Sequence, residues 1–400
     1  MAISIITQPQ LYSPSENPAI WQIQSDNPNI IFFRTTVQQA STNAVISVND
    51  FYTTPVYPYG SYVNLQKILY NYVAPQLEPD ITTFAVPLST PFLDYTLSIQ
   101  EWNYDTGSTL VVTGATTGTT TATTFNAALT RQVFNNFNYT NYVITSSAAT
   151  SVNFLTNKPD APLVNDLSTE HLYFMTENVN LKVRVQTFAA GSNVLLNTYN
   201  YSITGNGSDR MYRLQASPKA LVASLGVSFN NVGSYSIQIL DSANLPISVL
   251  RKYVYVPVDC GVDLVNILFE NDWGCYDSYQ FVNPQLTLNV TKTTLQTDIY
   301  GLDNNSVYSD KNGLVYNPST VTILTTPAKT YLATSKELKD VESYWLQELF
   351  KSKSIYVEDN NTGEMLPIQI TNTNYQITKQ RWQRSNANVF QINYQVADGI

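Results

Sequence analysis

The residue types that most often perform enzymatic chemistry are scarce in this sequence. It contains one histidine, His171, and two cysteines, Cys260 and Cys275. A Ser–His–Asp triad or a Cys–His pair would have to use His171, and nothing around it resembles a nucleophile motif. We therefore interpret His171 as a structural or solvated histidine at the start of a strand. One histidine and two cysteines 15 positions apart also match no closed zinc site, so no metal is expected.

Paired carboxylates are the one catalytic chemistry that the composition permits. Glu270, Asp272 and Asp277 flank Trp273, and a glycosidase needs two carboxyl groups beside aromatic platforms for sugars. Carboxylates are also ordinary surface residues, and this interpretation remains the less favoured one. We expect a protein that is not an enzyme.

Candidate sites for ions and cofactors are equally weak. Residues 303–305 with 310–313, and residues 359–361 with 363–364, have calcium-like oxygen ligands but lack the acidic residue at position 12 of a calcium loop. They are better interpreted as Asn-rich turns. Residues 114–118 (GATTG) lack the lysine and following helix of a phosphate-binding loop, so no cofactor is expected.

The two cysteines could form a disulfide with each other, but two buried thiols in a reducing cytosol are the favoured interpretation. A pair of cysteines cannot build the disulfide framework of a small secreted domain.

Composition indicates a β-rich protein of several domains. The chain has 400 residues, of which 13% are charged and 12% aromatic, with 28 tyrosines. The net charge of −9 excludes a chain-wide basic surface for nucleic acid, so nucleic acid is not expected as the main partner. No apolar run approaches the ~20 residues of a membrane-spanning helix, and no secretory signal is recognisable, so membrane insertion is not expected.

The first domain, residues 1–160, is predicted to be β-rich with one helix. Alternating apolar residues predict strands at 30–37 and 95–100. Between them Asn64 can cap a helix whose apolar face comprises Leu65, Ile68, Leu69 and Tyr72, and Pro75 ends it. The Thr/Gly/Ala tract at 107–124 is predicted to be an exposed hairpin tip or loop.

Two further domains follow a Pro-containing boundary at residues 157–166. Residues 161–258 are predicted to form an Ig-like β-sandwich, because short alternating segments are separated by turn signals. Residues 259–400 are predicted to be an α+β domain. It has a helix at 335–350 opened by a Thr-x-x-Glu capping box at 334–337, a hairpin at 355–370 and a last strand at 390–396.

The ordered set of these segments resembles a family of virion proteins from tailed phages of Bacteroidetes hosts, including crAss-like phages. The resemblance rests on residues 17–21 (NPAIW), the strand at 30–37, residues 49–50 (ND), 59–65 (YGSYVNL), 154–159 (FLTNKP), 268–281 (LFENDWGCYDSYQF), 344–350 (YWLQELF), 354–357 (SIYV), 366–370 (LPIQI) and Tyr375. Cys275 departs from the family pattern, where a small or aromatic residue is common. The order and spacing cover most of the chain, and none of these motifs is catalytic.

The resemblance implies a structural subunit of the virion, in a tail, neck or baseplate ring, made in the cytoplasm of the bacterial host. The expected partners are further copies in a cyclic ring and other tail, neck or portal proteins. The residues that we expect at subunit contacts are Thr113, Thr116, Thr119 and Thr121 of the Thr-rich loop, Trp345 of the helix, Trp273 and Tyr276. For the helix, burial within its own subunit is the competing interpretation. The alternative function is a tail-fibre adhesin that recognises a host-surface glycan.

Overall fold

The computed structural model describes residues 3–54, 59–78, 82–104, 109–112, 120–145, 151–178, 180–205, 207–258, 263–296, 300–302, 308–310, 320–359, 362–372, 375 and 389–397. Strands far outnumber helices in these residues, which confirms the predicted mainly β, multi-domain fold. Among the described helices, none is long and apolar enough to cross a lipid bilayer.

Two sheets form an N-terminal sandwich. One contains β1 (Ile3–Thr7), β3 (Ile20–Ser25) and β6 (Gly60–Asn64), and the other contains β2 (Tyr12–Pro14), β10 (Thr120–Phe125), β8 (Phe92–Tyr104), β4 (Phe32–Gln39) and β5 (Val45–Tyr52), with β9 (Leu110–Val112) paired to β8. The predicted strands at 30–37 and 95–100 lie in β4 and β8, which pair antiparallel. Their apolar face, including Phe33 and Leu97, packs on Trp21 of β3.

The predicted helix after Asn64 is present but short. It comprises α1 (Gln66–Leu69) and the 3₁₀ turn η1 (Tyr70–Tyr72). The Asn64 side chain accepts a hydrogen bond from the Gln66 N–H at 3.1 Å, but the N-cap residue is Leu65, one position later than predicted. Leu65 and Leu69 are fully buried and Ile68 is half-buried, so the predicted apolar face is confirmed for these residues, whereas Tyr72 is 50% exposed and the prediction is wrong there.

The expectation of an exposed loop at 107–124 is wrong at its C-terminal end. Residues 120–125 form β10 between β2 and β8, and the residues from Ala122 to Phe125 are buried. Buried threonines are tolerated here because their hydroxyl groups form hydrogen bonds within the protein. Thr123 donates to Asp94 at 2.6 Å and Thr124 donates to the Ser13 carbonyl at 3.1 Å.

A second sandwich occupies the centre of the chain. Its four-stranded sheet contains β11 (Val143–Ile144), β13 (His171–Thr176), β16 (Met211–Gln215) and β7 (Ala85–Leu88), and its five-stranded sheet contains β12 (Leu163–Val164), β18 (Arg251–Tyr255), β17 (Val232–Leu240), β14 (Asn180–Ala189) and β15 (Leu195–Thr204). The helix α3 (Pro218–Leu225) packs on this core, whereas α2 (Arg131–Asn135) and the turn η2 (Tyr139–Asn141) precede β11. Because β7 and β11 come from the first 160 residues, this sandwich draws strands from both sides of the predicted boundary.

The C-terminal part forms a closed barrel in the order β19 (Leu264–Glu270), β20 (Tyr276–Gln296), β23 (Thr320–Thr334), β26 (Gln391–Val396), β25 (Met365–Ile370) and β24 (Ile355–Glu358). The predicted hairpin and last strand are β24–β25 and β26. The predicted helix is divided into α4 (Asp340–Trp345) and α5 (Gln347–Lys351). It begins at Asp340 rather than at 335, and the predicted capping box at 334–337 is wrong because Thr334 still belongs to β23. The N-cap residue is Lys339, whose N–H donates to the Glu342 carboxylate at 2.8 Å.

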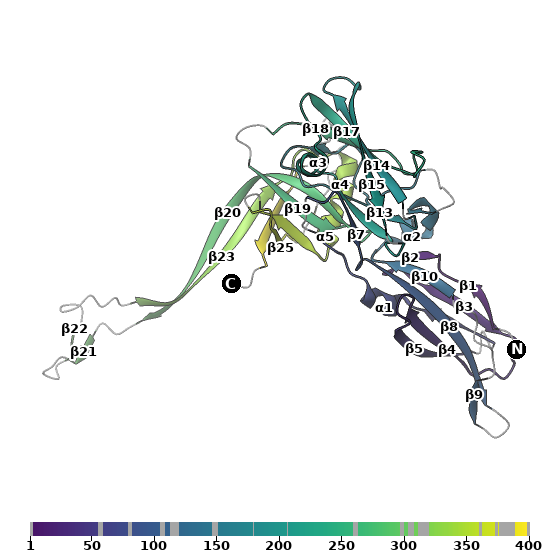
Figure 1. The fold of residues 1–400 in the computed structure, drawn as a ribbon. Coiled ribbons are helices and arrows are strands. Elements are labelled where there is room, and N and C mark those ends of the chain that lie inside the picture. The colour runs from purple at the N-terminus through teal and green to yellow at the C-terminus, as the bar shows by residue number, and fades with distance from the viewer. Residues whose placement is uncertain are drawn as a thin grey trace, which may run out of the picture.

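β20 and β23 continue far beyond the barrel as a two-stranded ribbon. Figure 1 shows this ribbon leaving the body on the side opposite the N-terminal sandwich, with β21 (Tyr300–Leu302) and β22 (Tyr308–Asp310) near its tip. We call residues 285–296 and 320–330 the shaft, and residues 285–330 together the arm. The rest of the chain is the body.

Candidate functional site

The body has three parts, the N-terminal sandwich, the central sandwich and the barrel. They meet in one apolar cluster, which we call the junction core. Its buried members come from all three parts and include Tyr12, Leu88, Phe125, Phe137, Val143, Leu155, Tyr173, Met175, Met211, Trp273, Cys275 and Tyr276. A shared core of this kind joins the sandwiches and the barrel by burial of apolar surface rather than by flexible linkers.

Three of the expected contact residues lie inside the body, so the expectation that they meet other subunits is wrong. Trp273 is 2% exposed, packs on Tyr142 with 4.2 Å between ring centroids, and donates from Nε1 to the Asn157 side chain at 3.0 Å. Tyr276 is buried in the same core. Trp345 packs on Phe269 inside the barrel, as the competing interpretation of the helix expected.

The Thr-rich segment gives a mixed outcome. Thr113, Thr116 and Thr119 lie outside the described residues. Thr121 is exposed on β10, opposite Thr96 of β8. Its expected role at a subunit contact stays a prediction.

The loop between β19 and β20, residues 271–275, connects the barrel to the other two parts. The Asn271 side chain accepts hydrogen bonds from the N–H groups of Trp273 and Cys275 at 3.0 and 3.1 Å, which closes the loop. Its amide also donates to the Leu155 carbonyl at 3.1 Å. Gly274 has φ +70° and lies against Asn126, so a β-carbon would not fit there.

A second connection runs through a buried carboxyl group on α5. The Glu348 side chain accepts hydrogen bonds from the Asn157 amide at 2.7 Å and from the Asp272 N–H at 3.2 Å. Burial raises the pKa of Glu348 to about 8, and the nearby carboxylates of Asp277 and Asp272 add to the shift. The group is therefore protonated at neutral pH, and it links the segment before the central sandwich to the barrel.

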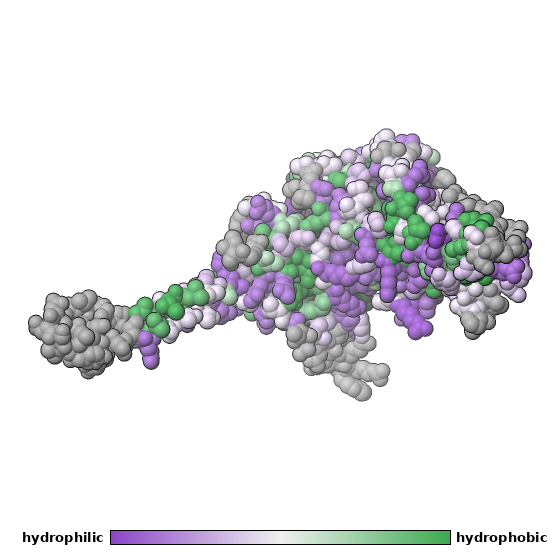
Figure 2. Space-filling model, turned by 90° about the horizontal axis from the view of Figure 1, so that it is seen from below, coloured by the Kyte–Doolittle hydropathy of each residue, from purple (hydrophilic) through white to green (hydrophobic). Residues whose placement is uncertain are grey.

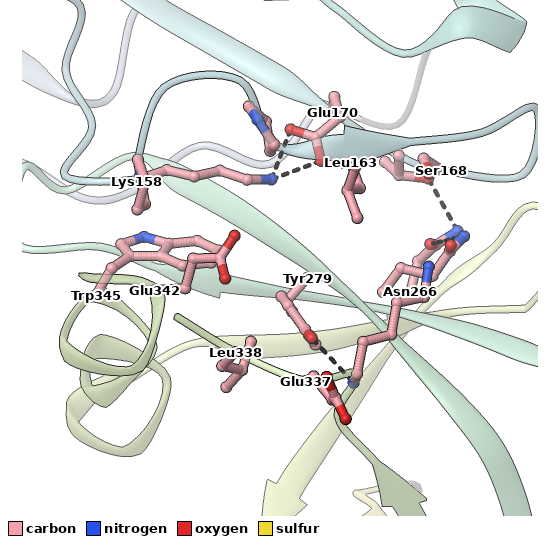
Figure 3. Close-up of a pocket in the computed structure, with 15 residues that line it drawn as sticks. Lys158, Leu163, Ser168, Glu170, Asn266, Tyr279, Glu337, Leu338, Glu342 and Trp345 are labelled. Carbon is pink, nitrogen blue, oxygen red and sulfur yellow. Dashed lines mark hydrogen bonds and ion pairs between the residues drawn. The ribbon is translucent and has the colours of Figure 1, made fainter. Parts of the chain in front are cut away.

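Lys158 forms a buried ion pair at the same interface. Its Nζ donates to both Glu170 carboxylate oxygens at 2.5 and 2.7 Å and to the Ser278 carbonyl at 2.8 Å, so its three protons are all used. It also lies 5.2 Å from the centre of the Trp345 ring. Figure 3 shows the lysine extended above Trp345 toward Glu170. These contacts connect the residues around the predicted boundary to both β20 and α4.

A small cavity of about 60 Å³ borders this ion pair. Its walls come from the segment at 158–170, from Asn266, Tyr279 and Gln280 of the barrel, and from the chain around α4 (Figure 3). Tyr279 accepts a hydrogen bond from the Lys336 N–H at 3.1 Å on the far wall. The cavity has space for few atoms, and all three N–H groups of the Lys158 side chain already donate hydrogen bonds to Glu170 and Ser278. We interpret it as a packing gap between two domains.

A third polar contact centres on Glu358 of β24. This carboxylate accepts hydrogen bonds from Thr169 and from Asn266, the latter at 2.8 Å, and pairs with Lys219 of α3. The central sandwich is thus bonded to the barrel at Glu170, at Glu358 and through the junction core.

The residues first considered for chemistry are buried in this framework. Burial lowers the pKa of His171 well below its usual range, so the imidazole is neutral, and burial raises the pKa of the Cys275 thiol well above its usual range. Cys275 is a free thiol, whereas Cys260 lies outside the described residues. No group of three or more His, Cys, Asp or Glu side chains in the described part of the chain could hold a metal ion.

The three carboxylates considered for glycosidase chemistry serve separate structural contacts. Glu270 accepts from the Asn126 amide at 2.8 Å, and Asp277 accepts from Thr156 at 2.8 Å and from Trp345 Nε1 at 2.9 Å. The backbone of Asp272 makes two contacts: its N–H donates to Glu348 of α5, and its carbonyl accepts from the N–H of Ala128, in the segment after β10. Trp273, the expected sugar platform, is buried between them. Of the residues expected in the calcium-like segments, Asp359 and Gly363 form a turn with φ +74° at the glycine, whereas residues 303–305 and 311–313 lie outside the described residues.

Sequence reasoning missed the exposed apolar surface of the shaft. Its exposed apolar side chains are Leu286, Leu288, Val290, Leu295, Val321, Ile323 and Leu324, several of them more than half exposed. Figure 2 shows them gathered along the ribbon, away from the body. Two long Thr-rich segments of strand-forming residues with almost no charge flank residues 297–319, and this symmetry was the signal that could have predicted a hairpin.

No protein-family model and no curated protein matches the chain. One solved structure with weak similarity is the trypsin-activated alpha-2-macroglobulin from Escherichia coli, with a TM-score of 0.20 and 8% identity over 84% of this chain and 23% of that one. A marsupial T cell receptor has a TM-score of 0.19 and 9% identity over 83% of this chain and 95% of that one. The dimeric latent PorU from Porphyromonas gingivalis has a TM-score of 0.19 and 10% identity over 89% of this chain and 31% of that one. The chain thus spans about a quarter of the macroglobulin and about a third of PorU. At this level of similarity the comparisons do not bear on fold or function.

Proposed function

We propose that this chain is a structural subunit of a bacteriophage virion, built into a tail, neck or baseplate ring through contacts with copies of itself and with other virion proteins. The observation that carries the proposal is the shaft, where apolar side chains extend into solvent far from the body. Exposed apolar surface of this kind marks a site of contact with another protein. A protruding ribbon is suited to reach a neighbouring subunit.

The body supports this role. Its two sandwiches and barrel share the junction core and are bonded through Lys158–Glu170, Glu348 and Glu358. A subunit that transmits load through a particle requires such a rigid body, whereas an enzyme requires accessible reactive groups. The resemblance of the ordered motifs to virion proteins of Bacteroidetes phages supports a phage virion as the particle in this proposal.

Antibody-gold labelling of intact particles from the source tests the proposal. Gold at the neck, tail or baseplate is the expected result, and antibody absorbed beforehand with the purified protein provides the control. A label only at fibre tips would replace the proposal with the glycan-binding adhesin. No label on intact or permeabilised particles would show that the protein is not part of the virion.

A further inference from the structure

Within the part of the chain that the structure describes, no other element packs on the shaft. Residues 285–296 and 320–329 are exposed on both faces of the two strands. Among the described strands, β19 pairs with β20 only up to Val282, and β26 pairs with β23 only from Tyr331. Both outer edges of the shaft therefore lack a strand partner among the described residues.

An isolated two-stranded ribbon is at best marginally stable in water, and it requires a further strand or an apolar surface against it. The cross-strand pairs Leu288–Lys329, Val290–Pro327 and Leu295–Val321 place apolar groups on the ribbon but bury none of them. With 12 residues in the longer strand the shaft is about 40 Å long. This length can carry the contact area of about 800 Å² per partner that stable protein interfaces use, provided that the partner contacts more than one side.

Charge favours the body of a second copy over its shaft as the partner. The shaft carries Lys292 and Lys329 and no carboxylate, whereas the arm as a whole has three lysines and three aspartates. The body therefore carries the entire net charge of −9. A shaft laid on another shaft would bring lysines together without a compensating acid, whereas a shaft laid on another body brings opposite charges together.

We propose that the shaft of one copy docks on the body of a second copy of this chain. The two surfaces in this contact differ, so the interface is heterologous, and such interfaces link copies head to tail into a ring or a filament. The free edges of the shaft allow backbone pairing with an edge strand of the acceptor, in addition to burial of its leucines and valines. This inference deepens the proposed function, because it names the contact through which a ring of subunits would be held.

Two variants and a mixing experiment test the docking. The first variant, called armless, replaces residues 289–328 by Asn-Gly, which removes all of the arm except residues 285–288 and 329–330 and keeps the barrel ends of β20 and β23. The second carries Lys292→Glu and Lys329→Glu, and its control carries Lys67→Glu and Lys252→Glu, which make the same change in net charge at exposed positions of the body. Mass photometry and sedimentation velocity measure the oligomers.

We expect the wild-type chain to form oligomers at micromolar concentration, the armless chain to be monomeric, and the shaft-lysine variant to dissociate at least tenfold more readily than its control. When mixed, the armless chain must still accept a wild-type shaft and so appear in mixed oligomers of reduced size. A monomeric wild-type chain, or an armless chain that joins no wild-type oligomer, would overturn the proposal. The first result would show no self-association, and the second would indicate contact between arms.

These outcomes are distinguishable from those of the particle labelling. A chain that is monomeric but labels the tail would contradict the docking and the contacts between copies, and leave the proposed place in the virion intact. A chain that assembles through its shaft but labels no particle would contradict the virion role and leave the docking intact.

Discussion

Gly274 in the β19–β20 loop lies directly against Asn126, which follows β10, although 148 residues separate the two in sequence. A β-carbon on Gly274 would lie 1.7 Å from the Asn126 carbonyl oxygen. The Asn126 amide donates to the Gly274 carbonyl at 3.3 Å and to Glu270 at 2.8 Å. These hydrogen bonds connect the barrel to the N-terminal sandwich, and the contact between Gly274 and Asn126 leaves no space for a side chain at position 274.

Gly274→Ala should lower the free energy of unfolding by more than about 2 kcal/mol. The left-handed backbone costs a non-glycine residue about 1–2 kcal/mol, and the displaced Asn126 backbone adds an overpacking cost of about 1–3 kcal/mol. Urea denaturation followed by tryptophan fluorescence measures the change. The matched control is Gly191→Ala, because Gly191 has φ +72° but no atom within 4 Å of the added carbon. Equal losses in both variants would mean that the contact with Asn126 contributes nothing.

Lys158→Met should destabilise the protein by about 3–5 kcal/mol, because it leaves the Glu170 carboxyl buried without its partner. Both side chains are 7% exposed, and burial already raises the pKa of Glu170. The double variant Lys158→Met with Glu170→Met removes both charges and should recover at least half of the lost stability. Chemical denaturation of the two variants and the wild type provides the measurement. A double variant no more stable than the single one would show that the ion pair is not the cause.

Glu348 should contribute a fall in stability as pH rises, which the buried neutral His171 opposes below its usual pKa. Its pKa is 4.5 in an unfolded chain and about 8 in the folded protein. Between these values the Glu348 carboxyl binds more protons in the folded state, so its contribution to the free energy of unfolding decreases from about pH 4.5 to about pH 8 and then levels off. Glu170, Glu270 and Asp272 have raised pKa values as well and contribute with the same sign.

Glu348→Gln isolates the contribution of this one residue. It should flatten the slope of stability against pH by at most about 1.4 kcal/mol per pH unit, the value for one proton. Denaturation at several pH values from 5 to 9 measures the slope. Glu337→Gln, at an exposed position, is the control and should leave the slope unchanged. An identical slope in wild type and Glu348→Gln would show that Glu348 is ionised in the folded protein.

Local patterns predicted the individual strands well and their partners poorly. Alternation in β4, β8, β14 and β26 reports which side of a strand is buried, which is a local property. The pairing of β7 with β16 and of β11 with β13 joins segments far apart in sequence, and no local signal specifies it. These two strands are the reason that the central sandwich crosses the expected boundary.

The candidate residues failed for a related physical reason. Trp273, Tyr276 and Trp345 were expected at a surface because large aromatic side chains are common in interfaces, but they are equally common in cores, and residue type alone does not distinguish the two. The shaft was missed because its strands are separated by residues 297–319, so the hairpin lacks a short turn signal.

Cys275 provides a chemical test of whether the junction core opens. It is 2% exposed, and burial raises the pKa of its thiol well above the usual range. Because the thiolate is the reactive form, a Cys260→Ser variant, in which Cys275 is the remaining thiol, should resist iodoacetamide at pH 8 in the folded state and react fully in urea. Mass spectrometry of timed samples measures the labelled fraction.

Adding Gly274→Ala to that variant should accelerate labelling at least tenfold, because the displaced loop carries Cys275 and its opening exposes the thiol. Adding Gly191→Ala instead should leave the rate nearly unchanged, since that glycine lies in the turn between β14 and β15, far from the junction core. Rapid labelling of the Cys260→Ser variant in the native state would show that the junction core is open to solvent. The three parts of the body would then be held by their polar contacts alone, and the Lys158→Met variant should label faster still.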